Sequence, residues 1–165
     1  MNAPLHIVID EREQTPWAWP PDAAVTSRRS LVAGDYALKQ DCEEVKGRGM
    51  LAVRFAIERK SLNDFLGTIA GGWERFQREL VRMESFPARV VIVEGDMEDV
   101  CFTETAAGIE VPDHDHPMLT PKFVCRRIAE LTMMNVSVLL AGNAGYAAAL
   151  AYRVFRRRVE MERGR

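Results

Sequence analysis

The stretch Ile57–Asp64, with the sequence IERKSLND, decides the expected fold of this 165-residue chain. Its first three residues also belong to a segment, Leu51–Arg59, in which apolar and charged side chains alternate. Such alternation predicts a β-strand. The alternation places Glu58 and Lys60 on the same face, two residues apart, so their head groups can share a site. Ser61 then opens a segment with the apolar spacing of a helix. The stretch therefore predicts a strand that presents charge on one side and leads directly into a helix.

Two acidic residues upstream also lie at the ends of expected strands. Asp10 ends an apolar run that begins at Leu5, and Asp35 follows Gly34 between two strands expected within Val25–Leu38. Carboxylates bind hard cations such as Mg²⁺, and such ions polarise a phosphate and activate water. A lysine beside them can orient that water or offset charge in the transition state. The pattern indicates a metal-dependent phosphodiesterase, although an E-x-K spacing also occurs on ordinary solvent-facing strands.

The rest of the chain predicts the fold class. Strands and helices alternate through its second half, which favours an α/β core with a central mixed β-sheet flanked by helices. The polar segment Thr103–Thr120 predicts a mobile loop. A length of 165 residues predicts a single domain over residues 1–165. The expected later strands are Arg89–Glu94 and Val136–Ala141, and the expected helices after the first are Trp73–Glu84, Pro121–Met134 and Ala144–Val159.

The composition excludes several classes of protein. The hydrophobic fraction of 47% and the charged fraction of 28% are ordinary for a globular protein. No apolar stretch approaches the roughly 18 residues of a membrane span, and the amino terminus does not have the pattern of a secretory signal. The cysteines Cys42, Cys101 and Cys125 are scattered, which favours free thiols in a reducing compartment. We therefore expect a cytoplasmic protein with no membrane partner.

The charge distribution is more informative than the net charge of −2. Between Arg153 and Arg165, six arginines stand against Glu160 and Glu162. These arginines can contact phosphates. They also fit the solvated end of a helix, where cations are favoured. The sequence leaves both interpretations open.

Three segments together resemble the XPF/Mus81/Hef (ERCC4-type) nuclease domain: Asp10–Glu13, Gly34–Tyr36 and Glu58–Asp64. The signature of that family is G-D-X(n)-E-R-K-X(3)-D, and this chain matches it in full. The likeness continues through Trp73–Arg82, Val90–Glu94 and Leu139–Asn143, and it covers about Leu5–Arg158. The resemblance implies a restriction-endonuclease-like fold and hydrolysis of DNA near branches, flaps or junctions, with Mg²⁺ or Mn²⁺ as cofactor.

The resemblance also implies roles for individual residues. Asp35 and Glu58 are implied as metal ligands, with Asp10 as a third acid that holds the metal directly or through water. Lys60 is implied to position the attacking water or to steady the phosphate. Arg59 is implied as a catalytic residue, but strand alternation puts it opposite Glu58, where an ion pair that braces the acids is equally expected. The DNA-binding residues expected are Arg12, Glu13, Arg75 and Arg78, the first two alternatively bracing the acids.

Several other residues have an alternative explanation. Asp64, the last residue of the signature, fits a capping box with Ser61 at a helix start, and this structural role is favoured. The triplet His114–His116 resembles a metal-binding motif but is more typical of loop surface. Trp17 and Trp19 can stack on unpaired bases, although tryptophans close to prolines more often anchor a loop.

The resemblance implies partners as well. Many family members carry a helix-hairpin-helix or helicase module, and we expect neither in this chain. We expect a homodimer, with the apolar faces of the helices at 121–134 and 144–159 as a candidate interface. The expected substrate is branched, flapped or single-stranded DNA in repair or recombination. The alternative is a non-catalytic DNA-binding or dimer-partner module of the same fold, which the complete set of acids and lysine argues against.

Overall fold

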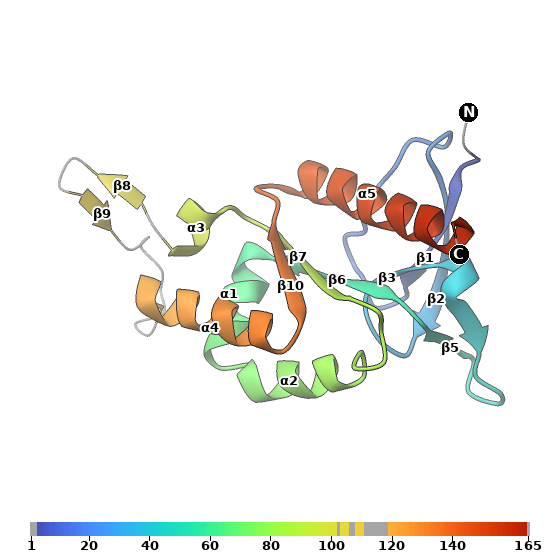
Figure 1. Cartoon of the computed structure of the whole chain (residues 1–165), viewed down its shortest axis with the longest axis horizontal. Helices are drawn as coiled ribbons and strands as arrows, with labels where there is room; N and C mark the ends of the chain where they lie inside the picture. Colours follow the sequence, from blue (N-terminus) through green and yellow to red (C-terminus); the bar gives the residue numbers. More distant parts are fainter. Residues whose placement is uncertain (1–2, 102, 106–107, 111–118, 165) are drawn as a thin grey trace.

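A computed structural model describes residues 3–101, 103–105, 108–110 and 119–164. The strands of its main sheet are β1 (Leu5–Asp10), β2 (Ala24–Leu31), β3 (Tyr36–Leu38), β4 (Cys42–Glu44), β5 (Met50–Val53), β6 (Ala56–Ser61), β7 (Arg89–Glu94) and β10 (Val136–Leu140). The helices are α1 (Leu62–Ala70), α2 (Trp73–Val81), α3 (Met97–Cys101), α4 (Pro121–Met133) and α5 (Ala144–Arg163), with a short 3₁₀ helix η1 (Lys39–Asp41). In this part of the chain the eight strands are ordered β10-β7-β6-β3-β1-β2-β5-β4 (Figure 1).

The sheet is mixed, and its register brings three strand positions together. β1 pairs in parallel with β2 and antiparallel with β3, β3 pairs antiparallel with β6, and β6 pairs in parallel with β7. Ile9 lies opposite Tyr36, and Tyr36 lies opposite Ile57. An acidic residue adjoins each of these three positions in the sequence. The expected α/β core with a mixed sheet is confirmed, and the three acids lie at one level of it.

Helices cover both faces of the sheet (Figure 1). On one face, α1, α2 and α4 pack over strand residues that include Ala56, Val91 and Val93. On the other face, α5 packs over alternate residues such as Ile57 and Ile92. Because side chains alternate along a strand, Glu58 and Lys60 belong to the α2 side and Arg59 to the α5 side. No helix in the described residues is long and apolar enough to cross a membrane.

The first helix begins as the sequence predicts. The Ser61 hydroxyl accepts a hydrogen bond from the main-chain N–H of Asp64 (3.1 Å) and donates one to its carboxylate (2.7 Å). The predicted capping role of Ser61 is confirmed, and Asp64 contacts the cap. α1 therefore starts directly at the end of β6, and the cap fixes the direction in which the chain continues from the strand into the helix.

The prediction of one strand over residues 51–59 is wrong at its centre. β5 ends at Val53 and β6 begins at Ala56, because β5 pairs with β2 near one edge of the sheet while β6 pairs with β3 and β7. The chain has to cross between these places, and the N–H of Arg54 bonds to the carbonyl of Asp41 at the bend (2.9 Å). Phe55 remains buried in the bend, so the alternation continues across the break and hides it.

The polar segment expected as a mobile loop contains regular structure. Two short strands, β8 (Thr103–Thr105) and β9 (Gly108–Glu110), pair antiparallel within it. They form a separate two-stranded ribbon at one end of the molecule (Figure 1). The triplet His114–His116 lies outside the described residues.

Candidate active site

Asp35 lies where the chain before β3 passes very close to β6. This close contact depends on Gly34. Gly34 has a φ of +73°, and a side chain there would overlap the Cβ of Ala56 on β6. This approach lets the N–H of Asp35 donate to the carbonyl of Ile57 (3.0 Å). The N–H of Arg59 in turn donates to Oδ2 of Asp35 (2.7 Å). The carboxylate of Asp35 is thus fixed against β6.

Glu58 and Lys60 form an ion pair on the α2 side of β6. The distance from Lys60 Nζ to Glu58 Oε1 is 2.7 Å, and the two side chains are only 15% and 13% exposed. Burial by itself lowers the pKa of Lys60, but the charge of Glu58 and its hydrogen bond outweigh burial and raise the pKa. The aromatic ring of Phe76 lies beside the ammonium, 5.4 Å away. Lys60 is therefore a charged group held next to the carboxylates.

The carboxyl group of Asp35 carries the largest electrostatic strain in the site. Its pKa is raised to about 8, first by burial and then by the neighbouring charge of Glu58. The hydrogen bond from Arg59 and the charge of Lys60 oppose this shift but do not cancel it. Two close carboxylates with too little positive charge between them favour protonation of one or binding of a cation.

A cavity of about 220 Å³ opens onto these groups. Asp35, Glu58 and Lys60 line one side of it. Three arginines line it as well: Arg12, Arg75 and Arg82. Arginine binds phosphate through planar, paired hydrogen bonds, so the cavity combines carboxylates for a cation with guanidinium groups for phosphates.

Arg75 and Arg78 of α2 were predicted to bind DNA, and that role stays a prediction for both. Arg75 lines the cavity, whereas Arg78 does not. Glu79 and Arg82, which were not among the predicted site residues, line it instead. Positions 75, 79 and 82 are spaced i, i+4 and i+7, so they share one helix face. This spacing is a signal in the sequence by which the two residues can be found.

Asp10 is buried and fully hydrogen-bonded. Its Oδ1 accepts from the N–H and the Nε of Arg12 (2.9 and 2.6 Å), and its Oδ2 accepts from the N–H of Leu31 (2.7 Å). Burial by itself raises the pKa of Asp10, but the hydrogen bonds from Arg12 and Leu31 outweigh it and lower the pKa. Asp10 does not line the cavity, whereas Arg12 does. These contacts fit a residue that positions Arg12, and a metal-binding role for Asp10 stays a prediction.

Arg59 lies in an ion-pair cluster on the α5 side of the sheet. Its Nε and Nη2 donate to the two carboxylate oxygens of Glu94 (2.7 and 2.9 Å), and its Nη1 donates to Glu13 (2.9 Å). The indole N–H of Trp17 also donates to Glu94 (2.6 Å). The side chains of Arg59, Glu94 and Glu13 are 13%, 12% and 9% exposed. Arg59 and Glu13 do not line the cavity; they connect β6, β7 and the loop after β1.

The two tryptophans of the proline-rich loop anchor it to the core. Trp17 is 5% exposed and stacks on Tyr36, with ring centroids 4.5 Å apart. The indole N–H of Trp19 donates to the carbonyl of Ala148 on α5 (2.8 Å). These contacts agree with the interpretation of Trp17 and Trp19 as loop anchors.

The donor set fits a hard divalent cation. Asp35, just before β3, and Glu58 of β6 present carboxylates from neighbouring parts of the sheet. Mg²⁺ is commonly bound through one or two carboxylates together with water and substrate phosphates. Among the described residues, no group of three or more His, Cys, Asp or Glu side chains is placed to hold a metal ion. A site completed by water and substrate is therefore a better fit than a protein cage. Burial is the main cause of the raised pKa of Asp35, and a cation would offset the charge of Glu58 that adds to it.

Comparisons with known proteins agree with this geometry. A family model described as the ERCC4 domain matches residues 9–153. Among solved structures, XPF from Aeropyrum pernix matches with a TM-score of 0.60 and 17% sequence identity, over 96% of this chain and 69% of that chain. No curated protein sequence matches the chain. The structural match shows a shared fold, and the family match spans most of the sequence. The chain therefore belongs to the ERCC4 domain family.

Proposed function

We propose that this chain is a divalent-metal-dependent endonuclease that hydrolyses phosphodiester bonds of DNA near branches, flaps or junctions. The observation that carries the proposal is the cavity in which Asp35, Glu58 and Lys60 meet three arginines. Membership of the ERCC4 family supports the same chemistry. Asp35 and Glu58 would hold Mg²⁺ or Mn²⁺.

The residues of the cavity divide the work of hydrolysis. When bound, the metal ion polarises the scissile phosphate and lowers the pKa of a bound water. Lys60, held 2.7 Å from Glu58, orients the attacking water and offsets the negative charge that builds up on the phosphate. Arg12, Arg75 and Arg82 hold phosphates of the strand by charge-assisted hydrogen bonds.

Two further residues act through their neighbours in this proposal. Asp10 holds the guanidinium of Arg12, which lines the cavity. Arg59 contacts Asp35 through its main-chain N–H, while its side chain binds Glu94 and Glu13 on the other face of the sheet. Both residues therefore position groups of the site without contact between their side chains and the phosphate.

The metal-free protein is expected to lose stability as the pH rises. The folded pKa of Asp35, about 8, lies above its ordinary value of 3.8, so between these pH values the folded state binds more protons than the unfolded state. The stabilisation is full below the ordinary pKa and is lost as the pH rises through the folded pKa. Mg²⁺ or Mn²⁺ should restore stability at high pH and release a proton on binding. Thermal unfolding over a pH series, with and without each ion, measures both effects.

The variant Asp35→Asn provides the control for this pH dependence. It should flatten the fall in stability of the metal-free protein, because no proton is left to lose. It should also remove most of the stabilisation by metal. A variant that responds to Mg²⁺ as the wild type does would show that Asp35 is not a ligand.

Cleavage of a panel of labelled DNA substrates tests the proposed activity. The panel contains flap, fork, four-way junction, single-stranded and plain duplex DNA of one common sequence, each incubated with Mg²⁺, Mn²⁺, Ca²⁺ or a chelator. Branched substrates should be cut faster than plain duplex in Mg²⁺ or Mn²⁺ and remain intact with the chelator. Tight binding without cleavage in either metal would instead identify a non-catalytic module of the same fold.

We also propose that the chain forms a homodimer and acts in the cytoplasm in DNA repair or recombination. The apolar faces of α4 and α5 that were expected at the interface pack inside the chain, where Val124, Leu131 and Phe155 are buried. These three side chains are therefore not available to a second copy. Exposed apolar side chains on the same helices, Met133 and Tyr146, remain available.

A further inference from the structure

A second hollow with a basic rim lies at the opposite end of β1 from the candidate active site. Its volume is about 370 Å³. Its floor includes the apolar residues Leu5 and Val159. Its cationic side chains come from two elements, and they are Lys39 of η1 and Arg156 and Arg163 of α5. We call this site the basic hollow.

The positive charge of the basic hollow has no acidic partner among its own lining residues, none of which is an aspartate or a glutamate. Arg156 donates only to neutral groups among its described contacts, the carbonyl of Ala3 (3.0 Å) and the hydroxyl of Tyr152 (2.8 Å). Within the described ranges, Lys39 and Arg163 form no ion pair. Three cations thus converge without a counter-ion.

Glu162, which adjoins Arg163 in the sequence, is already engaged elsewhere. Glu162 accepts from Arg158 (2.9 Å) and from the amide of Gln40 (2.7 Å). Arg158 also binds both carboxylate oxygens of the buried Asp41. This network connects α5 to η1 and holds the elements that carry the three cations, but it leaves their charge uncompensated.

The basic hollow differs from the arginine pairs on the rest of the surface. Arg29 pairs with Glu44 at 2.9 Å, and Arg126 lies 3.6 Å from Glu130. The preference of a helix end for cations accounts for Arg163, in the last turn of α5. It does not account for Arg156, about two turns earlier, or for a lysine on a different element. Like charges that converge repel each other, and an anionic ligand removes that repulsion.

We propose that the basic hollow binds backbone phosphates of a DNA arm that extends beyond the cleavage site. The proposal rests on the proposed function. β1 spans six residues, so its two ends lie about 17 Å apart. At 3.4 Å per nucleotide this corresponds to about five nucleotides. The path over the surface from the cavity to the basic hollow is at least this long, so a shorter DNA arm cannot reach both sites.

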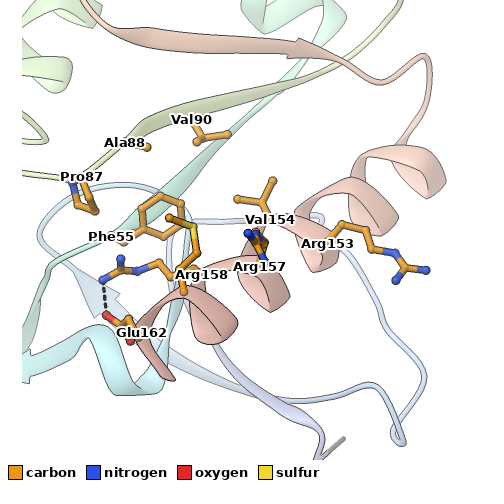
Figure 2. A pocket seen from close by; sticks show the side chains of 10 residues that line it. Phe55, Pro87, Ala88, Val90, Arg153, Val154, Arg157, Arg158 and Glu162 are labelled. Carbon is orange, nitrogen blue, oxygen red and sulfur yellow. Dashed lines mark ion pairs between the residues drawn. The ribbon is translucent and has the colours of Figure 1, made fainter. Parts of the chain in front are cut away.

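A neighbouring hollow on the other side of α5 shows why phosphate is assigned to the basic one. That hollow, of about 460 Å³, is lined by apolar groups that include Phe55, Pro87 and Val154. Figure 2 shows Arg153 pointing away from the other side chains that line it, and the ion pair between Arg158 and Glu162 within it. The larger hollow is thus mainly apolar, and the charge of Arg158 within it is compensated by Glu162.

Binding of DNA in metal-free buffer tests the proposal without cleavage. The double variant Lys39→Ala/Arg163→Ala removes two exposed cations, and Arg48→Ala/Arg126→Ala is the charge-matched control outside the hollow. Fluorescence anisotropy over a salt series gives the slope of log K against log salt for branched DNA with arms of about 20 base pairs. Loss of two phosphate contacts should make the slope less negative by about 1.8 and weaken binding at least about tenfold. The control should keep the wild-type slope.

A second series of measurements varies the length of the DNA arms. With arms of fewer than about five nucleotides, the double variant should show the same slope as the wild type. An unchanged slope on long arms overturns the proposal, as does an equal loss on short and long arms. If the double variant no longer binds inorganic phosphate but binds DNA as the wild type does, the basic hollow is a site for small anions. That result also overturns the proposal.

The two proposals can fail separately. A reduced slope in a protein that cuts no DNA supports the basic hollow and rejects the nuclease. Cleavage with an unchanged slope does the opposite. Arg156→Gln, which keeps a hydrogen-bond donor toward Ala3 and Tyr152, should reproduce part of the effect, and circular dichroism confirms that each variant is folded.

Discussion

The variant Glu58→Gln is expected to cut DNA roughly 1,000-fold more slowly than the wild type in Mg²⁺. Glutamine keeps the size of the side chain but removes the charge that the metal and Lys60 require. The metal contributes several kcal/mol of transition-state stabilisation, and a loss of about 4 kcal/mol corresponds to roughly 1,000-fold in rate. Single-turnover cleavage of a labelled flap, with enzyme in excess, measures the chemical step directly.

Asp64→Asn is the matched control, because it makes the same acid-to-amide change in the same signature. Asp64 contacts the cap of α1, and an asparagine there can still accept a hydrogen bond from Ser61. Cleavage per folded molecule should stay within about twofold of the wild type. If Asp64→Asn were as slow as Glu58→Gln, the last acid of the signature would belong to the chemistry and not to the helix start.

The variant Arg59→Met is expected to lower the free energy of unfolding by about 3–5 kcal/mol. It leaves the carboxylates of Glu94 and Glu13 almost buried with no guanidinium to pair with. Urea unfolding at neutral pH, followed by circular dichroism, measures the loss. Arg54→Met is the control, since Arg54 is 58% exposed and lies 3.6 Å from its acid; its cost should be below about 1 kcal/mol.

Acidification should reduce the difference between Arg59→Met and the wild type. Burial by itself raises the pKa of Glu94, but the hydrogen bond from Arg59 outweighs it and lowers the pKa below its ordinary value of 4.5. The stability that Glu94 contributes is therefore present above that value and lost as the pH falls through the folded pKa. In the variant the unpaired carboxylate gains a proton more easily, so acid costs it less. A small loss of stability with a complete loss of cleavage would make Arg59 a catalytic residue and refute the bracing role.

The sequence was sufficient to predict which face of the sheet each residue of β6 occupies. Alternation along β6 separates Glu58 and Lys60 from Arg59, because a strand can place neighbours only on opposite faces. The start of α1 followed from Ser61, whose hydroxyl is a local partner for the helix N–H groups. These features depend on contacts between residues close in sequence, which is why a pattern reveals them.

The remainder depends on distant contacts. Asp10 accepts a hydrogen bond from the N–H of Leu31, which lies 21 residues away in sequence and is brought close by the pairing of β1 with β2. The break between β5 and β6 follows from their places in the sheet, and Phe55 conceals it because it is buried in the bend. Glu79 and Arg82 reach the cavity only because α2 packs on the Glu58 face. None of these arrangements is specified by one segment alone.

Gly34 is required by the fold, whereas Asp35 and Glu58 are required only by the proposed reaction. A side chain at this position would overlap Ala56 and push β6 away from β3, so the glycine is required wherever these two strands meet in this way. A relative that has abandoned hydrolysis but kept this sheet should still carry the glycine, while it is free to replace Asp35 and Glu58. The glycine of the signature therefore identifies the architecture in a newly found sequence, and only the acids and the lysine distinguish a working enzyme from a silent copy.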